Sequence, residues 1–193
     1  MKKYKLTTFS ILAMAFIAGC TSYIPKPKAY PRIDYPVKNY VAIETECPFT
    51  FERPTYSKLI PIEASIQNCW YNLAFTPFDA TLHLSYVPMS SPSDLDSLTE
   101  DAYKMVYKPH TQVAVEIIQS EIIDTTQGYY GMIYDLEGKT ATPFNFYLTD
   151  KKNHFFRGSF YFNSKTEADS VQPIYDFLNK DIMHTISTFK FKN

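Results

Sequence analysis

The stretch from residue 112 to residue 162 constrains the fold most, because four strand patterns follow one another there with short connections. The expected strands span residues 112–123, 129–136, 141–148 and 154–162. Their links contain Gln127-Gly128, Glu137-Gly138 and Asp150-Lys151-Lys152-Asn153, which are typical of tight turns. Links this short join antiparallel neighbours, since a parallel crossover needs about a dozen residues or more. The sequence therefore predicts an antiparallel meander.

The last strand of this meander carries aromatic residues on both of its faces. Phe156, Phe160 and Phe162 alternate onto one face, while Phe155 and Tyr161 point to the other. Aromatic side chains on both faces must be shielded from water on both sides. We expect the sheet to be covered on both faces at this strand.

Further strands are expected before the meander, at residues 40–44, 48–52, 69–75 and 80–87. The last of these alternates cleanly, with Leu82, Leu84 and Tyr86 on one face and polar residues on the other, as in a half-buried strand.

Two helices complete the predicted domain. The first has Ser93 as its expected N-cap and ends at Pro109, and its apolar side consists of Leu95, Leu98, Ala102 and Met105. The second spans residues 169–187, with Pro173 expected in its first turn, and a short strand follows at 189–192. Its apolar stripe consists of Val171, Ile174, Leu178, Ile182 and Ile186. The fold class is therefore α+β: an antiparallel sheet meander with a mid-chain helix and a long C-terminal helix.

Residues 1–19 have the layout of a bacterial lipoprotein signal peptide. Three lysines precede an apolar run at residues 6–17, and Ile17-Ala18-Gly19 leads into Cys20. The alternative is a transmembrane helix, but that requires about 20 apolar residues and this run is shorter. We expect cleavage before Cys20 and lipid, palmitate included, on its sulfur and amino group.

The segment 20–38 contains four prolines and no glycine, a composition that favours an extended, semi-rigid tether. A polyproline ligand for an aromatic groove is the alternative. The remaining residues, 39–193, suffice for a single α+β domain. Without the three lysines of the signal peptide the chain has 16 basic and 20 acidic residues, a net charge of about −4 that excludes a nucleic-acid partner.

Two cysteines remain once Cys20 is assigned to lipid. In an exported protein, Cys47 and Cys69 are expected to form a disulfide that closes a loop of about 20 residues and contributes about 3 kcal/mol. Two separate buried thiols are the alternative.

Signals for catalysis are weak. The histidines at positions 83, 110, 154 and 184 lack the i+2 or i+4 spacing that places two imidazoles on one metal, so no metal site or cofactor is predicted. Asp150, His154 and Ser159 invite comparison with a catalytic triad, although a hairpin turn is the commoner location for such residues. Arg157, with Asp150 and His154, is a candidate for contacting a partner.

Tyr129, Tyr130 and Tyr134 are a further candidate binding face, with cross-strand packing as the alternative.

Several short blocks, taken together and in order from Cys20 to the end, resemble the GldD family of gliding-motility lipoproteins. These blocks are Arg32-Ile33-Asp34, Cys47-Pro48-Phe49-Thr50-Phe51, Cys69-Trp70-Tyr71-Asn72, His83-Leu84-Ser85-Tyr86, Phe146-Tyr147-Leu148-Thr149-Asp150, His154-Phe155-Phe156-Arg157-Gly158 and Asp169-Ser170-Val171. The resemblance implies a role in the gliding-motility and type IX secretion machinery, no enzymatic activity or cofactor, and lipidation at Cys20. By element order alone, the chain also resembles the PsbP/Mog1-like α+β fold.

Two functions are therefore expected. The first is a lipid-anchored, non-enzymatic component or assembly factor whose partners are other envelope lipoproteins of the motility and secretion apparatus. The alternative is a periplasmic ligand-binding or hydrolytic domain that uses the polar stretch from Asp150 to Ser159. Thr21 after Cys20, and the lack of acidic residues just beyond it, favour an outer-membrane anchor facing the periplasm.

Overall fold

The computed structural model describes residues 32–63, 69–164 and 168–192. The chain divides into two units, Met1–Ile33 and Asp34–Asn193, and the fold is that of the second unit. The signal peptide and most of the predicted tether lie outside the described residues. Among the described residues, none of the helices combines the length and apolar character needed to span a bilayer.

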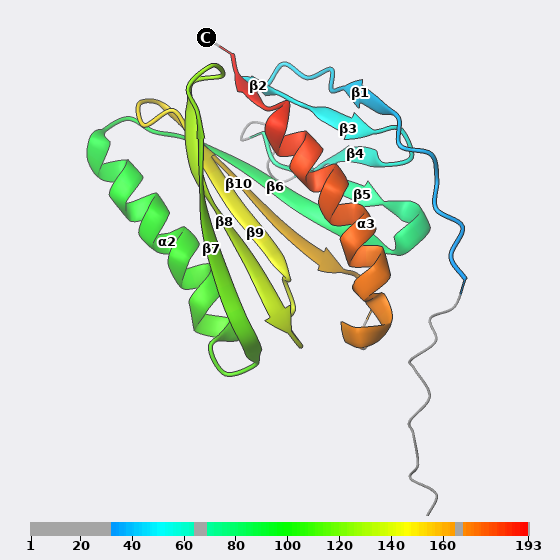
Figure 1. Cartoon of the computed structure of the whole chain (residues 1–193). Coiled ribbons are helices and arrows are strands. Elements are labelled where there is room, and N and C mark those ends of the chain that lie inside the picture. Colours follow the sequence, from blue (N-terminus) through cyan, green and yellow to red (C-terminus); the bar gives the residue numbers. More distant parts are fainter. Residues whose placement is uncertain (1–31, 64–68, 165–167, 193) are drawn as a thin grey trace, which may run out of the picture. The chain divides into compact units, whose positions relative to one another are not determined.

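A seven-stranded antiparallel sheet forms the centre of this unit (Figure 1). Its strands are β4 (Lys58–Pro61), β5 (Tyr71–Phe75), β6 (Ala80–Pro88), β7 (Ala114–Asp124), β8 (Tyr129–Gly138), β9 (Phe144–Thr149) and β10 (His154–Phe162). They are arranged in the order β4-β5-β6-β10-β9-β8-β7, so the last four strands form the predicted meander. In the register of the central strand, Phe156 lies between Tyr86 and Leu148.

Helix α3 (Ala168–Ser187) covers one face of the sheet and α2 (Pro92–His110) covers part of the other. Under α3, Phe156 and Phe160 are fully buried with Leu178 and Ile182. On the opposite face, Phe155 packs against Ala102 and its neighbours on α2. The prediction that both faces are covered at β10 is therefore confirmed.

Two small sheets close the core beside α3. β1 (Tyr40–Ala42) pairs with β3 (Glu52–Pro54), and β2 (Phe49–Thr50) pairs with β11 (Lys190–Phe191). A short 3-10 turn, η3 (Thr76–Phe78), connects β5 to β6. The backbone of Glu52 accepts a hydrogen bond from Thr185 and donates one to Thr188, which fixes β3 along α3.

Three details of the predicted helices are wrong. The N-cap of α2 is Ser91 and not Ser93, because Pro92 occupies the first helical position and the Asp94 carboxylate accepts hydrogen bonds from the Ser91 backbone and hydroxyl. Met105 is 56% exposed, and Val106 is buried in its place. Pro173 lies in the second turn of α3, since the helix already begins at Ala168.

Strand β4 was not predicted from the sequence. It is only four residues long, begins with a lysine and ends with a proline, so it carries little of the pattern that marks a strand.

Gly158, in the middle of β10, leaves the space that the ring of Phe146 on β9 occupies. A Cβ atom built on Gly158 would lie 2.1 Å from Cε1 of Phe146. Both residues are buried in the core under α3. A glycine at this position therefore allows an aromatic ring to lie directly across the central strand.

Gly158→Ala is expected to lower the free energy of unfolding by about 1–3 kcal/mol, because Phe146 must leave its rotamer to avoid the new methyl group. Urea denaturation measures this loss. Ser159→Ala, at the next residue and on the opposite face of the strand, is the control and is expected to change stability little. Equal stability of the two variants would contradict this account of Gly158.

Candidate functional site

Asp150 lies in the turn between β9 and β10, and its carboxylate stabilises that turn. Its Oδ1 atom accepts hydrogen bonds from the backbone N–H groups of Lys152, Asn153 and His154, each at 2.9 Å. Partial burial raises the pKa of Asp150, but these backbone donors outweigh burial, so the pKa lies below its ordinary value. The carboxylate stays ionised as the acceptor that shapes the hairpin.

His154 and Ser159 do not join Asp150 in a catalytic arrangement. Nδ1 of His154 lies 2.7 Å from the hydroxyl of Tyr86, and its ring stacks on that of Phe191. Ser159 is five residues further along the same strand and therefore faces the other side of the sheet. The structure places the base and the nucleophile of the expected triad on opposite faces.

Arg157 lies on the face covered by α2, where its guanidinium donates a hydrogen bond to the sulfur of Met105. Burial lowers the pKa of Arg157, while the charge of Asp101 acts in the opposite direction. Arg157 and Ser159 both line a cavity of about 10 Å³, which has no room for a ligand larger than water.

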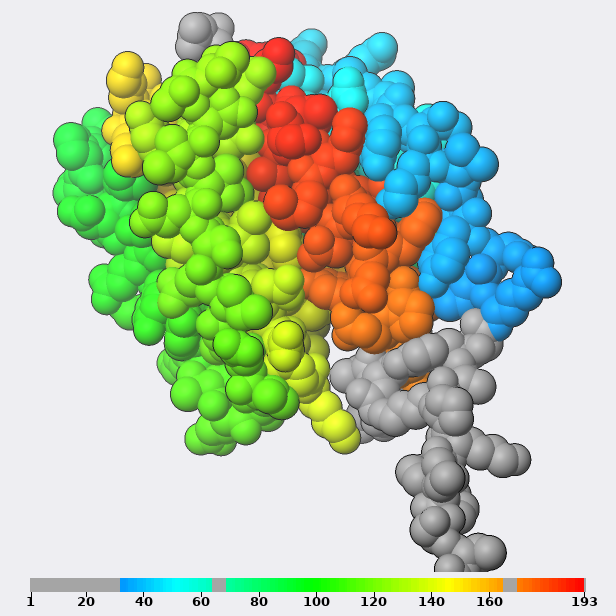
Figure 2. All heavy atoms as spheres, viewed as in Figure 1, coloured from blue at the N-terminus to red at the C-terminus, as the bar shows by residue number. Residues whose placement is uncertain are grey.

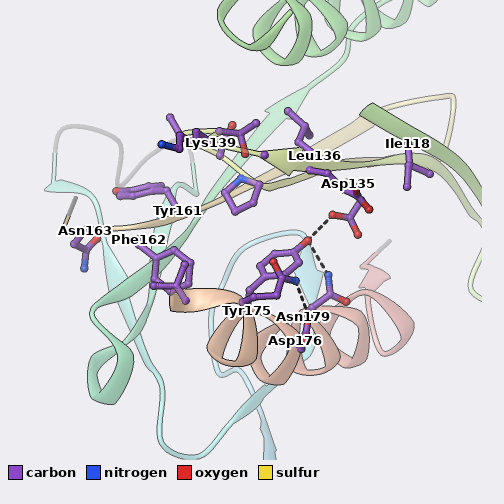
Figure 3. A pocket seen from close by; sticks show the side chains of 18 of the residues that line it. Ile118, Asp135, Leu136, Lys139, Tyr161, Phe162, Asn163, Tyr175, Asp176 and Asn179 are labelled. Carbon is purple, nitrogen blue, oxygen red and sulfur yellow. Dashed lines mark hydrogen bonds between the residues drawn. The ribbon is translucent and has the colours of Figure 1, made fainter. Parts of the chain in front are cut away.

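The principal groove in the described part of the chain lies elsewhere, on the side of the sheet that α3 covers (Figure 3). It has a volume of about 1470 Å³ and is bounded by the end of β8 with the connection to β9, the end of β10 and the first half of α3. The side chains that define it include Asp135, Lys139, Tyr161, Phe162, Tyr175 and Asn179.

Tyr175 organises the polar wall of this groove. Its hydroxyl donates to Oδ1 of Asp135 at 2.6 Å and accepts from Nδ2 of Asn179 at 3.2 Å, as the dashed lines in Figure 3 show. Burial, followed by the bond to Asp135 and its charge, raises the pKa of Tyr175 well above its ordinary range. The hydroxyl therefore stays protonated, and its proton is used in the bond to Asp135.

None of these groove residues carries a local sequence pattern that marks a site. Asp135 comes from β8, Tyr161 from β10 and Tyr175 from α3, so only the folded chain brings them together.

A second polar cluster, the Asp181 cluster, joins the start of the folded unit to α3. It consists of Asp181 with Lys38, Tyr40 and Tyr56. Asp181 has no exposed surface, and its Oδ1 atom lies 2.6 Å from both Nζ of Lys38 and the hydroxyl of Tyr40. Tyr56 donates to the other carboxylate oxygen.

Lys38 has two further contacts with α3. Its ammonium donates to the backbone oxygen of Phe177 at 2.9 Å and lies 3.9 Å from the centre of the Phe177 ring. The last residue of the predicted tether is therefore held by a buried carboxylate.

Burial and the hydrogen bonds to Asp181 raise the pKa of both Tyr40 and Tyr56 above the ordinary tyrosine range. Both hydroxyls therefore remain donors to the carboxylate at neutral pH.

The four histidines have separate structural partners. His83 bonds to Asn72 and Tyr161, and burial lowers its pKa. His110 donates from Nδ1 to the carbonyl of Val106, and His184 lies 2.7 Å from a carboxylate oxygen of Glu52. Over residues 32–63, 69–164 and 168–192, no three His, Cys, Asp or Glu side chains gather into a possible metal site.

Cys47 and Cys69 are joined in a disulfide, with their Cα atoms 5.8 Å apart. The bridge ties the loop before β2 to the start of β5, beside Tyr71.

Of the three tyrosines considered as a binding face, Tyr129 and Tyr134 are buried in the core and Tyr130 is covered by Lys151. Tyr129 also donates to the carbonyl of Ile186, so packing is the role of these rings.

Comparison with known families gives one match. A family model described as "Gliding motility lipoprotein GldD" matches residues 20–191. The match begins at Cys20, the residue at which the signal-peptide pattern places lipidation. A search of curated proteins found no match.

Asp181→Asn is expected to lower the free energy of unfolding by about 3 kcal/mol, because Lys38 loses its counter-charge while two tyrosines lose a charged acceptor. Urea denaturation measures this loss, and trypsin should cleave after Lys38 faster than in the wild type. The control is Asp176→Asn, at an exposed position on the same helix. Matching urea midpoints and cleavage rates in the two variants would refute the anchoring role of Asp181.

Stability is expected to fall as the pH rises above about 10, the pKa of tyrosine in an unfolded chain. Tyr56 has a raised pKa in the folded state, so its stabilising contribution is complete below that pH and is lost as the pH rises through the folded pKa. Tyr56→Phe should therefore flatten the decline in unfolding free energy between about pH 9 and about pH 11. Tyr103→Phe, at an exposed tyrosine on α2, is the control, and parallel curves for all three proteins would exclude this linkage.

Proposed function

The chain belongs to the GldD family of gliding-motility lipoproteins, and from this we propose that it is a lipid-anchored, non-enzymatic component or assembly factor of the gliding-motility and type IX secretion machinery. The observation that carries the proposal is the extent of the family match, which covers residues 20–191 and so includes both Cys20 and the folded unit.

Three features support an anchored protein. Residues 1–19 have the signal-peptide pattern, Cys20 follows it directly, and a proline-rich segment separates Cys20 from the folded unit. At the other end of that segment, Lys38 is bound to the buried carboxylate of Asp181. A force applied to the lipid anchor would therefore be transmitted to the domain through α3.

The structural contacts of the polar side chains on β10 and in the turn before it support a role without catalysis. Asp150 shapes a turn, His154 contacts Tyr86 and Phe191, and Arg157 contacts Met105. The hydrolytic alternative requires these residues and Ser159 in one concave site, whereas Asp150 and His154 are absent from the groove and Ser159 faces the other side of the sheet.

Ligand binding remains a second candidate, favoured by the groove itself. Its aromatic and amide side chains, with Asp135 and Lys139 at the wall, suit a polar ligand of the envelope.

For location, we propose an outer-membrane anchor that faces the periplasm, with lipid that includes palmitate on Cys20. Thr21 and the lack of acidic residues just after Cys20 support this location. Other envelope lipoproteins of the apparatus are the proposed partners.

Cys20→Ala is expected to abolish lipid attachment and the association with envelope lipoproteins. Intact-mass measurement on protein from native membranes should show acyl chains on the wild type and none on the variant. Chemical cross-linking in the same membranes should join the wild type to motility or secretion lipoproteins. Thr21→Ala, which keeps the cysteine, is the control and should retain both the lipid and the cross-links.

If the wild-type protein carried no lipid and formed no cross-links, both the proposed anchor and the proposed role in the machinery would be contradicted. Lipid without cross-links would support the anchor and contradict the assembly role.

A further inference from the structure

The two edges of the central sheet are built differently. The edge strand β4 has four residues, begins with Lys58 and ends with Pro61, and both residue types discourage pairing with another strand. The opposite edge strand, β7, has eleven residues, Ala114–Asp124, and contains neither proline nor lysine. Its only irregularity is a bulge between Ala114 and Glu116 at its start. Among the residues that the structure describes, one edge is protected and the other is open.

Strand β7 is exposed along most of its length. Val115, Ile118 and Ile123 have 82%, 42% and 60% of their surface exposed. Within the described chain, β8 is the only strand that pairs with β7. In Figure 2 the green atoms of this segment run over the visible face with nothing laid across them. The outward N–H and C=O groups of a long edge strand are a template for an added strand.

The negative charge on this edge indicates the chemistry of a partner strand. β7 carries Glu116, Glu121 and Asp124 and no basic residue, and the neighbouring strand β8 adds Asp135 and Glu137. A second copy of the chain would bring two acidic strands side by side, which is unfavourable for like charges in cross-strand neighbours. By register, Glu116, Asp124 and Asp135 lie on the face that α3 covers, whereas Ile123 lies on the other face. A strand with basic residues on the first face and apolar residues on the second would therefore match this edge.

We propose that β7 is a strand-addition site that takes an extended apolar and basic segment of a partner protein. Main-chain hydrogen bonds to β7 supply much of the affinity, and alternate side chains supply specificity. On one face of the sheet, Ile118 lies at the wall of the groove, so an added strand would present its side chains there beside Asp135.

The site does not depend on the proposed role in motility, because binding can be measured with a purified chain and a synthetic peptide. The probe is a fluorescent peptide of about ten residues that alternates valine and lysine, matched in length to β7. Two comparison peptides replace lysine by glutamate or carry N-methyl groups on alternate backbone amides. Fluorescence anisotropy measures affinity for the full chain in a non-ionic detergent.

The valine and lysine peptide should bind, and each comparison peptide should bind about tenfold more weakly or not at all. Ile118→Lys should weaken binding about tenfold, because it places a cation and a long polar side chain on the receiving edge. Ile60→Lys is the matched control, since Ile60 is 46% exposed and lies on β4 at the other edge, and it should leave binding unchanged. Hydrogen exchange should slow in residues 114–124 when the peptide is bound.

Four outcomes would overturn the proposal. The first is no binding of the valine and lysine peptide. The second is equal loss of binding in Ile118→Lys and Ile60→Lys, and the third is equal binding of the N-methylated peptide; either would show attraction by charge alone. The fourth is a concentration-dependent dimer in sedimentation that Ile118→Lys converts to a monomer, which would identify a second copy as the occupant.

Discussion

The ring of Phe156 is the point at which separate parts of the chain meet, and the rest of the fold depends on its burial. It lies on β10, two residues before the middle of the strand, with no exposed surface. Its ring contacts those of Phe49 and Phe51 near β2, Phe146 on β9 and Phe189 after α3, at centroid distances between 4.7 and 6.3 Å. These contacts join early, middle and late segments of the domain, and the burial of so many rings makes a large stabilising contribution.

This aromatic core explains why α3 also organises the polar side of the fold. The helix must lie across the sheet to cover Phe156 and Phe160, and its next face then meets the segment that leads from the tether. Asp181 lies on that face without exposed surface, where only the donors Lys38, Tyr40 and Tyr56 make its burial tolerable. In a lipid-anchored protein, this places the attachment of the anchor segment on a helix whose other face packs on the aromatic core.

The exposed surface of the sheet has two distinct features. One end has the groove bounded by β8, β10 and α3, and the adjoining edge is the open strand β7. Neither feature involves the polar stretch that begins at Asp150. The Asp150 carboxylate bonds within the turn, His154 contacts Tyr86 and Phe191, and Arg157 contacts Met105. A groove and an open strand edge are features that fit the proposed role of a subunit that binds partners at a membrane.

Local patterns in the sequence were enough for the meander and both helices, because each depends on residues close together in the chain. Alternation, turn residues and helical spacing are short-range signals. Where two local signals competed, as at Ser91 and Ser93, the position of Pro92 decided the outcome. The Asp181 cluster and the groove could not be read in the same way, since their members come from segments up to 143 residues apart. The one local signal of that cluster was Asp181, a charged residue within the apolar stripe of α3 between Leu178 and Ile182. Only the tertiary structure supplied its partners, because long-range contacts are set by packing and not by neighbours in sequence.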